Sequence, residues 1–152
     1  MRFFCVFVLM ASLAVIARAQ TADTVGTLLP KDLVGEYSIV SSENGGKPVP
    51  AERIDGVIVR FTEDKIVTTD TDKKEIYAAT YELDSAQHPG KIRMTSTVPA
   101  FKGAKANGLI VKEGKMTKLI YRLPDGKEDP TEFKTKPGQI MVVMERIEKK
   151  DS

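Results

Sequence analysis

The chain has 152 residues, of which 41% are hydrophobic and 29% are charged, with one Cys, one His and no Trp. This length predicts a single domain that can bury a core of modest size without metal ions or disulfides. A single Cys excludes a disulfide within the chain, and 23 basic against 21 acidic residues argue against the strongly basic surface that favours nucleic-acid binding.

The N-terminal segment, residues 1–19, has the pattern of a cleaved secretory signal peptide. Arg2 supplies a positive start, residues 3–16 form a nearly unbroken apolar run, and residues 17–19 read Ala-Arg-Ala before Gln20. The run of about 14 residues is too short to span a bilayer comfortably, and no later run has the length that a spanning helix needs. We therefore expect a secreted or periplasmic protein, without a membrane span, whose mature chain is formally neutral and has no Cys.

Short runs of alternating apolar and polar residues fill the rest of the chain, separated by Gly, Pro, Asp and Asn. A flexible lead at residues 20–30 and one helical turn at residues 31–33 are expected first. The predicted strands cover residues 33–40, 57–62, 65–69, 75–83, 91–97, 108–112, 116–123, 131–135 and 139–147. Irregular loops are expected at residues 41–50 and 99–107, an edge connection at 51–54, and a tail at 149–152.

The spacing of these runs predicts an all-β domain over residues 31–148. Successive strands are joined by hairpin-length turns, and no helix longer than a turn or two is indicated. Such connections favour an antiparallel up-and-down barrel of about eight strands, and closure of the sheet also removes the exposed edges that invite aggregation.

Five stretches carry a resemblance to a known family, and they are LVGEYSIVSSENGGKPVP, FTEDKIVTTD, ATYELDSAQHPGKIRM, GLIVKEGKMTKLIYRLPDGKEDPTEF and VVMERI. In this order and spacing they resemble the lipocalin-like domain family of unknown function that is abundant in planctomycete bacteria. The resemblance covers nearly all of the mature chain. It implies a lipocalin-like, calycin-type barrel but no activity, so function has to be argued from a site.

The resemblance also implies how one end of the barrel closes. Gly35-Glu36-Tyr37 is similar to the Gly-x-Trp of lipocalins, in which the aromatic residue packs under an Arg from the last strand, and Arg146 has the place of that Arg. The chain departs from the family by having Tyr37 where the family has Trp. Tyr is a weaker cation-π platform than Trp. It also has Lys112 and Thr117 at positions that are more often apolar in the family.

The alternating pattern places aromatic residues on the face that would point into the barrel. The candidate ligand-binding residues of this face are Tyr37, Phe61, Tyr77, Tyr81, Tyr121 and Phe133. A small barrel is either filled by its own side chains or holds one small ligand, and the sequence leaves both readings open. Where a cavity exists, the Tyr hydroxyls would supply the few polar groups that orient a ligand.

Catalytic and metal-binding patterns are weak. His88 is the only His, and no Cys or second His accompanies it in the mature chain. The Asp70-Thr71-Asp72 run lacks the Gly and Glu that a calcium loop requires, and there is no Gly-x-Ser-x-Gly pattern. We therefore expect no catalytic residues, no metal site and no cofactor. The sequence leaves two roles open for Arg60, Arg93 and Arg122. They either gather into an anion-binding patch or form the solvent-facing side of their strands.

These features predict an exported, non-catalytic binding domain for a small, partly apolar ligand. The first alternative is a filled barrel that acts as an interaction or structural module of the cell envelope. Its loops at residues 41–51 and 99–107 would then contact another exported protein. A second alternative, an envelope enzyme, has no assembled set of base, nucleophile and oxyanion donors in the sequence to support it.

Overall fold

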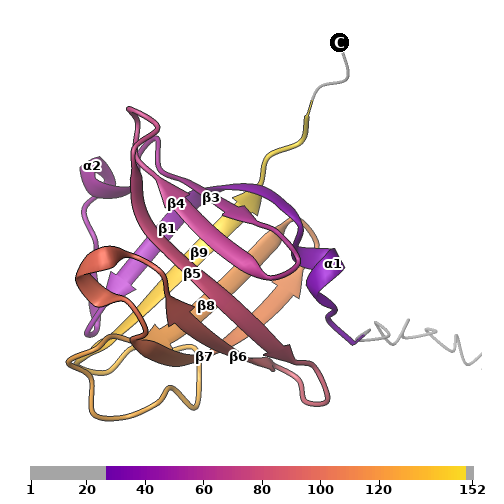
Figure 1. Cartoon of the computed structure of the whole chain (residues 1–152), viewed down its shortest axis with the longest axis vertical. Coiled ribbons are helices and arrows are strands. Elements are labelled where there is room, and N and C mark those ends of the chain that lie inside the picture. The colour runs from indigo at the N-terminus through magenta and orange to yellow at the C-terminus, as the bar shows by residue number, and fades with distance from the viewer. Residues whose placement is uncertain (1–26, 150–152) are drawn as a thin grey trace, which may run out of the picture.

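The structure, a computed structural model, describes residues 27–149, so the predicted signal peptide and most of the lead lie outside the described residues. Eight antiparallel strands form a closed barrel, with a ninth short strand beside it (Figure 1). The barrel strands are β1 (Gly35–Asn44), β3 (Ile58–Phe61), β4 (Lys65–Thr69), β5 (Glu75–Asp84), β6 (Gly90–Ser96), β7 (Lys105–Glu113), β8 (Met116–Arg122) and β9 (Gln139–Arg146). Each pairs with the next, and β9 pairs back with β1. The predicted all-β, lipocalin-like up-and-down barrel is confirmed.

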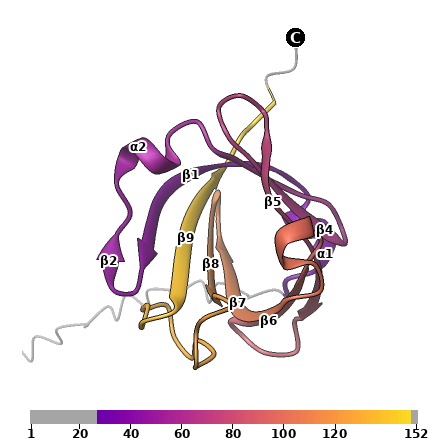
Figure 2. The ribbon, with the colours of Figure 1, turned by 60° about the vertical axis from the view of Figure 1, so that its left-hand side comes forward.

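The remaining elements are short. They are α1 (Pro30–Leu33), β2 (Lys47–Pro48), α2 (Ala51–Ile54) and the 3-10 turn η1 (Pro99–Phe101). Strand β2 pairs only with the end of β1, and Figure 2 shows it with α2 on the β1 side of the barrel. None of the helices in residues 27–149 has the length and apolar character needed to cross a membrane.

The interior of the barrel is built by strand alternation, since every second side chain points inward. One continuous row of inward positions runs Tyr37, Val59, Thr68 and Tyr77 across four neighbouring strands. The buried core that results contains Leu33, Tyr37, Val59, Phe61, Ile66, Ala79, Tyr81, Ile92, Met94, Ile110, Leu119 and Met144.

The connections between strands differ in length at the two ends of the barrel. At one end, which we call the plugged end, they are residues 62–64, 85–89 and 114–115, and α1 lies there. At the other end, which we call the open end, they are residues 45–57, 70–74, 97–104 and 123–138, with α2 among them. Short turns at the plugged end therefore leave the chain's longer segments to surround the opposite opening.

Three sequence expectations differ from the structure. Strand β1 continues through residues 41–44, which were expected to be loop, because these residues pair with β9 and thereby close the barrel. Strand β7 begins at Lys105, inside the loop expected at residues 99–107, because its first residues pair with β6. In both segments, pairing with a neighbouring strand outweighs a turn-like local composition.

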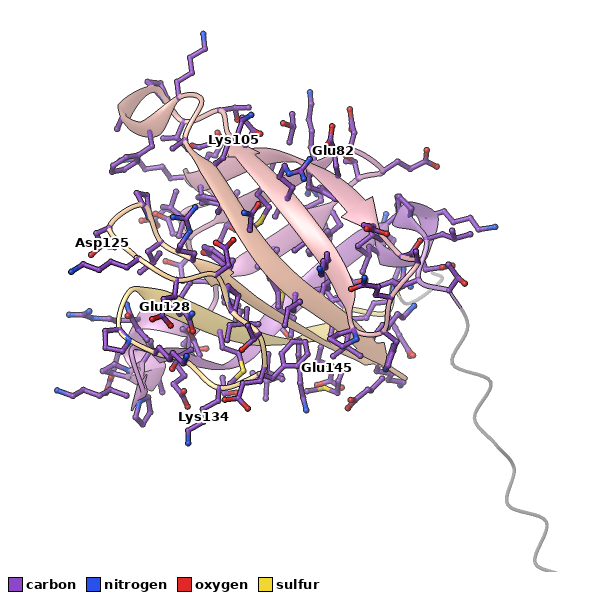
Figure 3. The ribbon with its side chains drawn as sticks, turned by 90° about the horizontal axis from the view of Figure 1, so that it is seen from below. Glu82, Lys105, Asp125, Glu128, Lys134 and Glu145 are labelled. Atoms are coloured by element: carbon purple, nitrogen blue, oxygen red, sulfur yellow. The ribbon has the colours of Figure 1, made fainter. Side chains whose placement is uncertain are left out.

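The third difference is that residues 131–135 form no strand. They belong to the β8–β9 connection, which lies against the outer wall of the barrel and carries Asp125, Glu128 and Lys134 (Figure 3). Asp129 in this segment accepts a hydrogen bond from Asn107 and pairs with Arg122, both on neighbouring strands. Side-chain contacts of this kind, and not a ladder of backbone bonds, hold the segment in place.

Candidate functional site

A cavity of about 270 Å³ lies inside the barrel at its open end. Its wall consists of residues from seven strands together with residues on and around α2. The lining residues are Ile39, Ser42, Val49, Arg53, Ile54, Val57, Val59, Ile66, Thr68, Ile76, Tyr77, Met94, Leu119, Tyr121, Ile140, Val142 and Met144. Several of them, such as Met94, Leu119 and Met144, also belong to the buried core, so the cavity ends on packed side chains.

Two tyrosines form the main polar feature of this cavity. Tyr77 of β5 and Tyr121 of β8 stack with their ring centroids 6.4 Å apart and their planes 24° apart. The inward position next to Tyr121 on β7 is Gly108, where a Cβ atom would lie 2.9 Å from the Tyr121 Cβ. The Ile120 carbonyl oxygen would lie closer still, at 2.3 Å, so a larger residue at Gly108 would displace the β8 backbone that carries Tyr121.

The hydroxyls of this tyrosine pair have little to bind within the protein. The Tyr77 hydroxyl lies 4.0 Å from the Met94 sulfur, a weak acceptor, and the Tyr121 hydroxyl has no hydrogen-bond partner among residues 27–149. Burial raises the pKa of both groups above the ordinary value of 10.0. Both hydroxyls therefore stay protonated at neutral pH and can donate to an acceptor in the cavity.

The plugged end of the barrel is sealed by α1. Leu33 is completely buried, and three successive backbone carbonyls at the end of α1 accept hydrogen bonds from inward side chains. Lys112 Nζ donates to the Asp32 carbonyl at 3.0 Å, the Tyr37 hydroxyl to the Leu33 carbonyl at 2.8 Å, and Arg146 Nη2 to the Val34 carbonyl. Lys112 thus has a structural role here.

Gly35, Tyr37 and Arg146, which the resemblance places together, are in contact. The Arg146 guanidinium lies 5.9 Å from the centroid of the Tyr37 ring. Gly35 has φ of +149°, and a Cβ at this position would lie 2.9 Å from Arg146 Nη2. Burial raises the pKa of Tyr37, and the positive charge of Arg146 acts in the opposite direction.

Three other aromatic residues of the predicted binding face pack in the plugged half. Phe61 makes edge-to-face contacts with Tyr37, at 5.5 Å between centroids, and with Tyr81, at 5.9 Å. The Tyr81 hydroxyl donates to the Thr62 carbonyl at 2.7 Å. Burial, with the nearby charges of Asp64 and Glu63, raises the pKa of Tyr81 to about 12. These rings fill the barrel and do not line the cavity.

The six predicted ligand-binding residues are therefore divided. Tyr77 and Tyr121 line the cavity, whereas Tyr37, Phe61 and Tyr81 form the aromatic part of the core. Phe133 is half-buried in the β8–β9 connection and belongs neither to the core nor to the cavity wall. Its predicted inward direction depended on a strand at residues 131–135 that does not form.

Several lining residues were not identified from the sequence. Ser42 faces the cavity because a bulge after Ile39 shifts the phase of β1 by one residue. Arg53 and Ile54 reach it from α2, a helix of four residues that is too short for apolar periodicity to reveal. The alternation of Ile140 and Val142 on β9 was visible in the sequence, and both residues line the cavity.

Elsewhere in the described residues, few side chains are placed for catalysis, metal binding or anion binding. His88 is exposed in the β5–β6 turn, beside two outer hollows of about 970 and 780 Å³, neither lined by aromatic residues. Residues 27–149 contain no group of three or more His, Cys, Asp and Glu side chains placed to hold a metal ion. Each of the three arginines of the predicted anion-binding patch is paired with a carboxylate, namely Arg60 with Glu36, Arg93 with Glu82 and Arg122 with Asp129.

The chain was compared with protein-family models, with curated proteins and with solved structures, and none of the three comparisons found a match.

Proposed function

We propose that this protein is an exported, non-catalytic binding domain that holds one small, mostly apolar ligand in the cavity at the open end of the barrel. The observation that carries the proposal is the stacked pair of Tyr77 and Tyr121 in the wall of a mostly apolar cavity, because their hydroxyls have little to bind in the protein. An apolar wall with a few orienting polar groups is the usual composition of a ligand pocket.

The size of the cavity limits the ligand. About 270 Å³ is slightly below the range of roughly 300–1,000 Å³ that is usual for pockets that bind drug-sized ligands. It corresponds to roughly nine water-sized groups, since a water occupies about 30 Å³ in the liquid. We therefore expect a ligand with one ring or a short chain and at least one hydrogen-bond acceptor.

Two further features support parts of this proposal. Residues 1–19 have the pattern of a signal peptide, which supports export to the periplasm or the outside of the cell. The resemblance to the lipocalin-like family supports the barrel in which the cavity lies, and it implies no activity. The alternative of a filled interaction module is less well supported, because the open half of the barrel is not filled by its own side chains.

The test is an NMR titration of the mature chain, residues 20–152, with acetophenone and with ethylbenzene. The two probes have nearly the same shape, but only acetophenone carries an acceptor for the tyrosine hydroxyls. We expect backbone shifts at cavity positions such as Thr68 and Val142, none at the outward neighbour Val143, and tighter binding of acetophenone.

A cavity-filling variant serves as the control. Val142→Phe places a ring in the cavity and should remove binding of both probes, whereas Val143→Phe on the outer face should leave binding unchanged. Shifts spread over the outer wall, or no binding of either probe at millimolar concentration, would contradict the proposal and favour the filled interaction module.

A further inference from the structure

Arg53 lies at the mouth of the cavity. Among the lining residues described above it is the only charged one, and no Asp or Glu is among them. The rest of the wall is formed by aliphatic side chains, two methionines, Ser42, Thr68 and the tyrosine pair. A positive charge at the rim of an apolar pocket favours an occupant with a negative charge at one end.

The other arginines of residues 27–149 all have partners within the protein. Arg60, Arg93 and Arg122 each pair with a carboxylate, and Arg146 binds the Val34 carbonyl and lies over Tyr37. Arg53 alone among them has neither an ion pair nor a side-chain hydrogen bond with another described residue. Its five N–H donors therefore remain available.

Backbone hydrogen bonds hold the turn that carries Arg53 in its helical shape. Arg53 N–H donates to the Pro50 carbonyl at 3.0 Å, and Asp55 N–H donates to the Ala51 carbonyl at 2.8 Å. Ile54, the next residue along the turn, also lines the cavity. The acidic neighbours on the turn, Glu52 and Asp55, are exposed and do not contribute to the cavity wall.

We propose that the ligand is an amphipathic carboxylate whose apolar body fills the cavity while Arg53 binds its carboxylate at the mouth. This inference rests on the proposed function and adds the charge and orientation of the ligand. A guanidinium matches a carboxylate with two parallel hydrogen bonds. Because Arg53 is exposed, the carboxylate stays at the solvent boundary and avoids the cost of burying a charge.

The preference for a carboxylate over a neutral ligand should be modest. Exposed ion pairs contribute little, and bidentate geometry contributes more, so we expect the carboxylate to bind about three to ten times more tightly than a neutral ligand of the same shape. The preference should also decrease as the salt concentration rises, since exposed charges are screened.

The test uses 3-phenylpropionate and 3-phenyl-1-propanol, which share one body and differ in the head group. Dissociation constants are measured by NMR titration for the wild-type chain, for Arg53→Gln and for Arg93→Gln. Arg93 is the matched control, because it is an exposed arginine on the outer wall and does not line the cavity. We expect Arg53→Gln to abolish the preference for the carboxylate and leave the affinity for the alcohol unchanged, and Arg93→Gln to change neither.

The remaining outcomes separate this inference from the proposed function. Equal affinities for the two probes in the wild-type chain would overturn the assignment of a carboxylate and leave the binding site in place. An equal loss of both affinities in Arg53→Gln would give Arg53 a structural role at the mouth and also overturn the assignment. Failure of both probes to bind the wild-type chain would overturn the proposed function itself.

Discussion

The two ends of the barrel use the same strands for different purposes. At the plugged end, Leu33 enters the interior and the side chains of Lys112, Tyr37 and Arg146 bind the backbone carbonyls at the end of α1. At the open end, Tyr77 and Tyr121 stack in a cavity and have no comparable bonds to the protein. The side chains that meet α1 are thus hydrogen-bonded within the protein, whereas the tyrosine hydroxyls of the open end are left available.

The difference follows from residue size along the inward rows. The large rings of Tyr37, Phe61 and Tyr81 fill the plugged half and contact one another edge to face. In the open half the inward positions include Ser42 and Thr68, which are too small to meet across the barrel. One half can therefore supply stability while the other supplies space for a ligand, and mutations should separate the two roles.

The largest expected effect is the loss of the plug. Leu33→Ala removes a completely buried side chain and should lower the free energy of unfolding by about 2–5 kcal/mol. Ile54→Ala, a change in a half-buried residue at the open end, should cost about 1 kcal/mol or less. Urea unfolding of the two variants measures both values. Equal costs would show that the open end contributes as much stability as the plug.

Alkaline pH should weaken the plugged half through Tyr81. Its pKa is raised to about 12 in the folded protein, against about 10 when unfolded, so the folded state holds the phenol proton more tightly. The raised pKa of Tyr81 adds about 2–3 kcal/mol to the free energy of unfolding below pH 10. This stabilisation is lost as the pH rises from about 10 to 12.

The measurement is the urea midpoint of the wild-type chain and of Tyr81→Phe at a series of pH values above 8. The difference in stability between the two proteins should narrow or reverse as the pH increases, because only the wild-type chain carries this titrating group. A constant difference up to pH 11.5 would show that Tyr81 titrates normally.

A Cβ atom at Gly35 tests the contact that closes the plugged end. Gly35→Ala combines an unfavourable φ with a Cβ placed 2.9 Å from Arg146 Nη2, and we expect a cost of about 2 kcal/mol. Gly103 at the open end has φ of +82° and no atom within 4 Å of its Cβ position, so Gly103→Ala measures the backbone term alone, at about 1 kcal/mol. Thermal unfolding compares the pair, and equal costs would mean that Arg146 moves aside freely.

The division between the two ends was only partly predictable from the sequence. Period-2 alternation identified the hairpin of β5 and β6 and gave the bounds of β4, since these strands have one face in the core. It also placed the four tyrosines on inward faces. It could not tell which end of the barrel each ring occupies, because that depends on the register between neighbouring strands and on where α1 enters.

Other features of the site left no local signal. Residues 41–44 have the composition of a turn, and their strand structure results from pairing with β9, about 100 residues away in the sequence. Phe133 was assigned to the interior because residues 131–135 look like a strand, yet the segment is held on the outer wall by side-chain contacts. Arg53 lies on a single helical turn, and only the folded chain brings it to the cavity.

The smallest expected effect contrasts two hydroxyl groups directly. Tyr37→Phe removes the donor to the Leu33 carbonyl and should destabilise the protein by about 1–2 kcal/mol, since it leaves a buried acceptor without its partner. Tyr121→Phe removes a hydroxyl that has no partner among residues 27–149, so its effect on stability should be within about 0.5 kcal/mol.

The Tyr121→Phe substitution should instead weaken the binding of acetophenone while leaving that of ethylbenzene unchanged. Urea unfolding and the probe titration together measure both responses. If Tyr121→Phe were as destabilising as Tyr37→Phe and left binding intact, Tyr121 would be part of the structural core, and the open end would lose its main argument for a ligand.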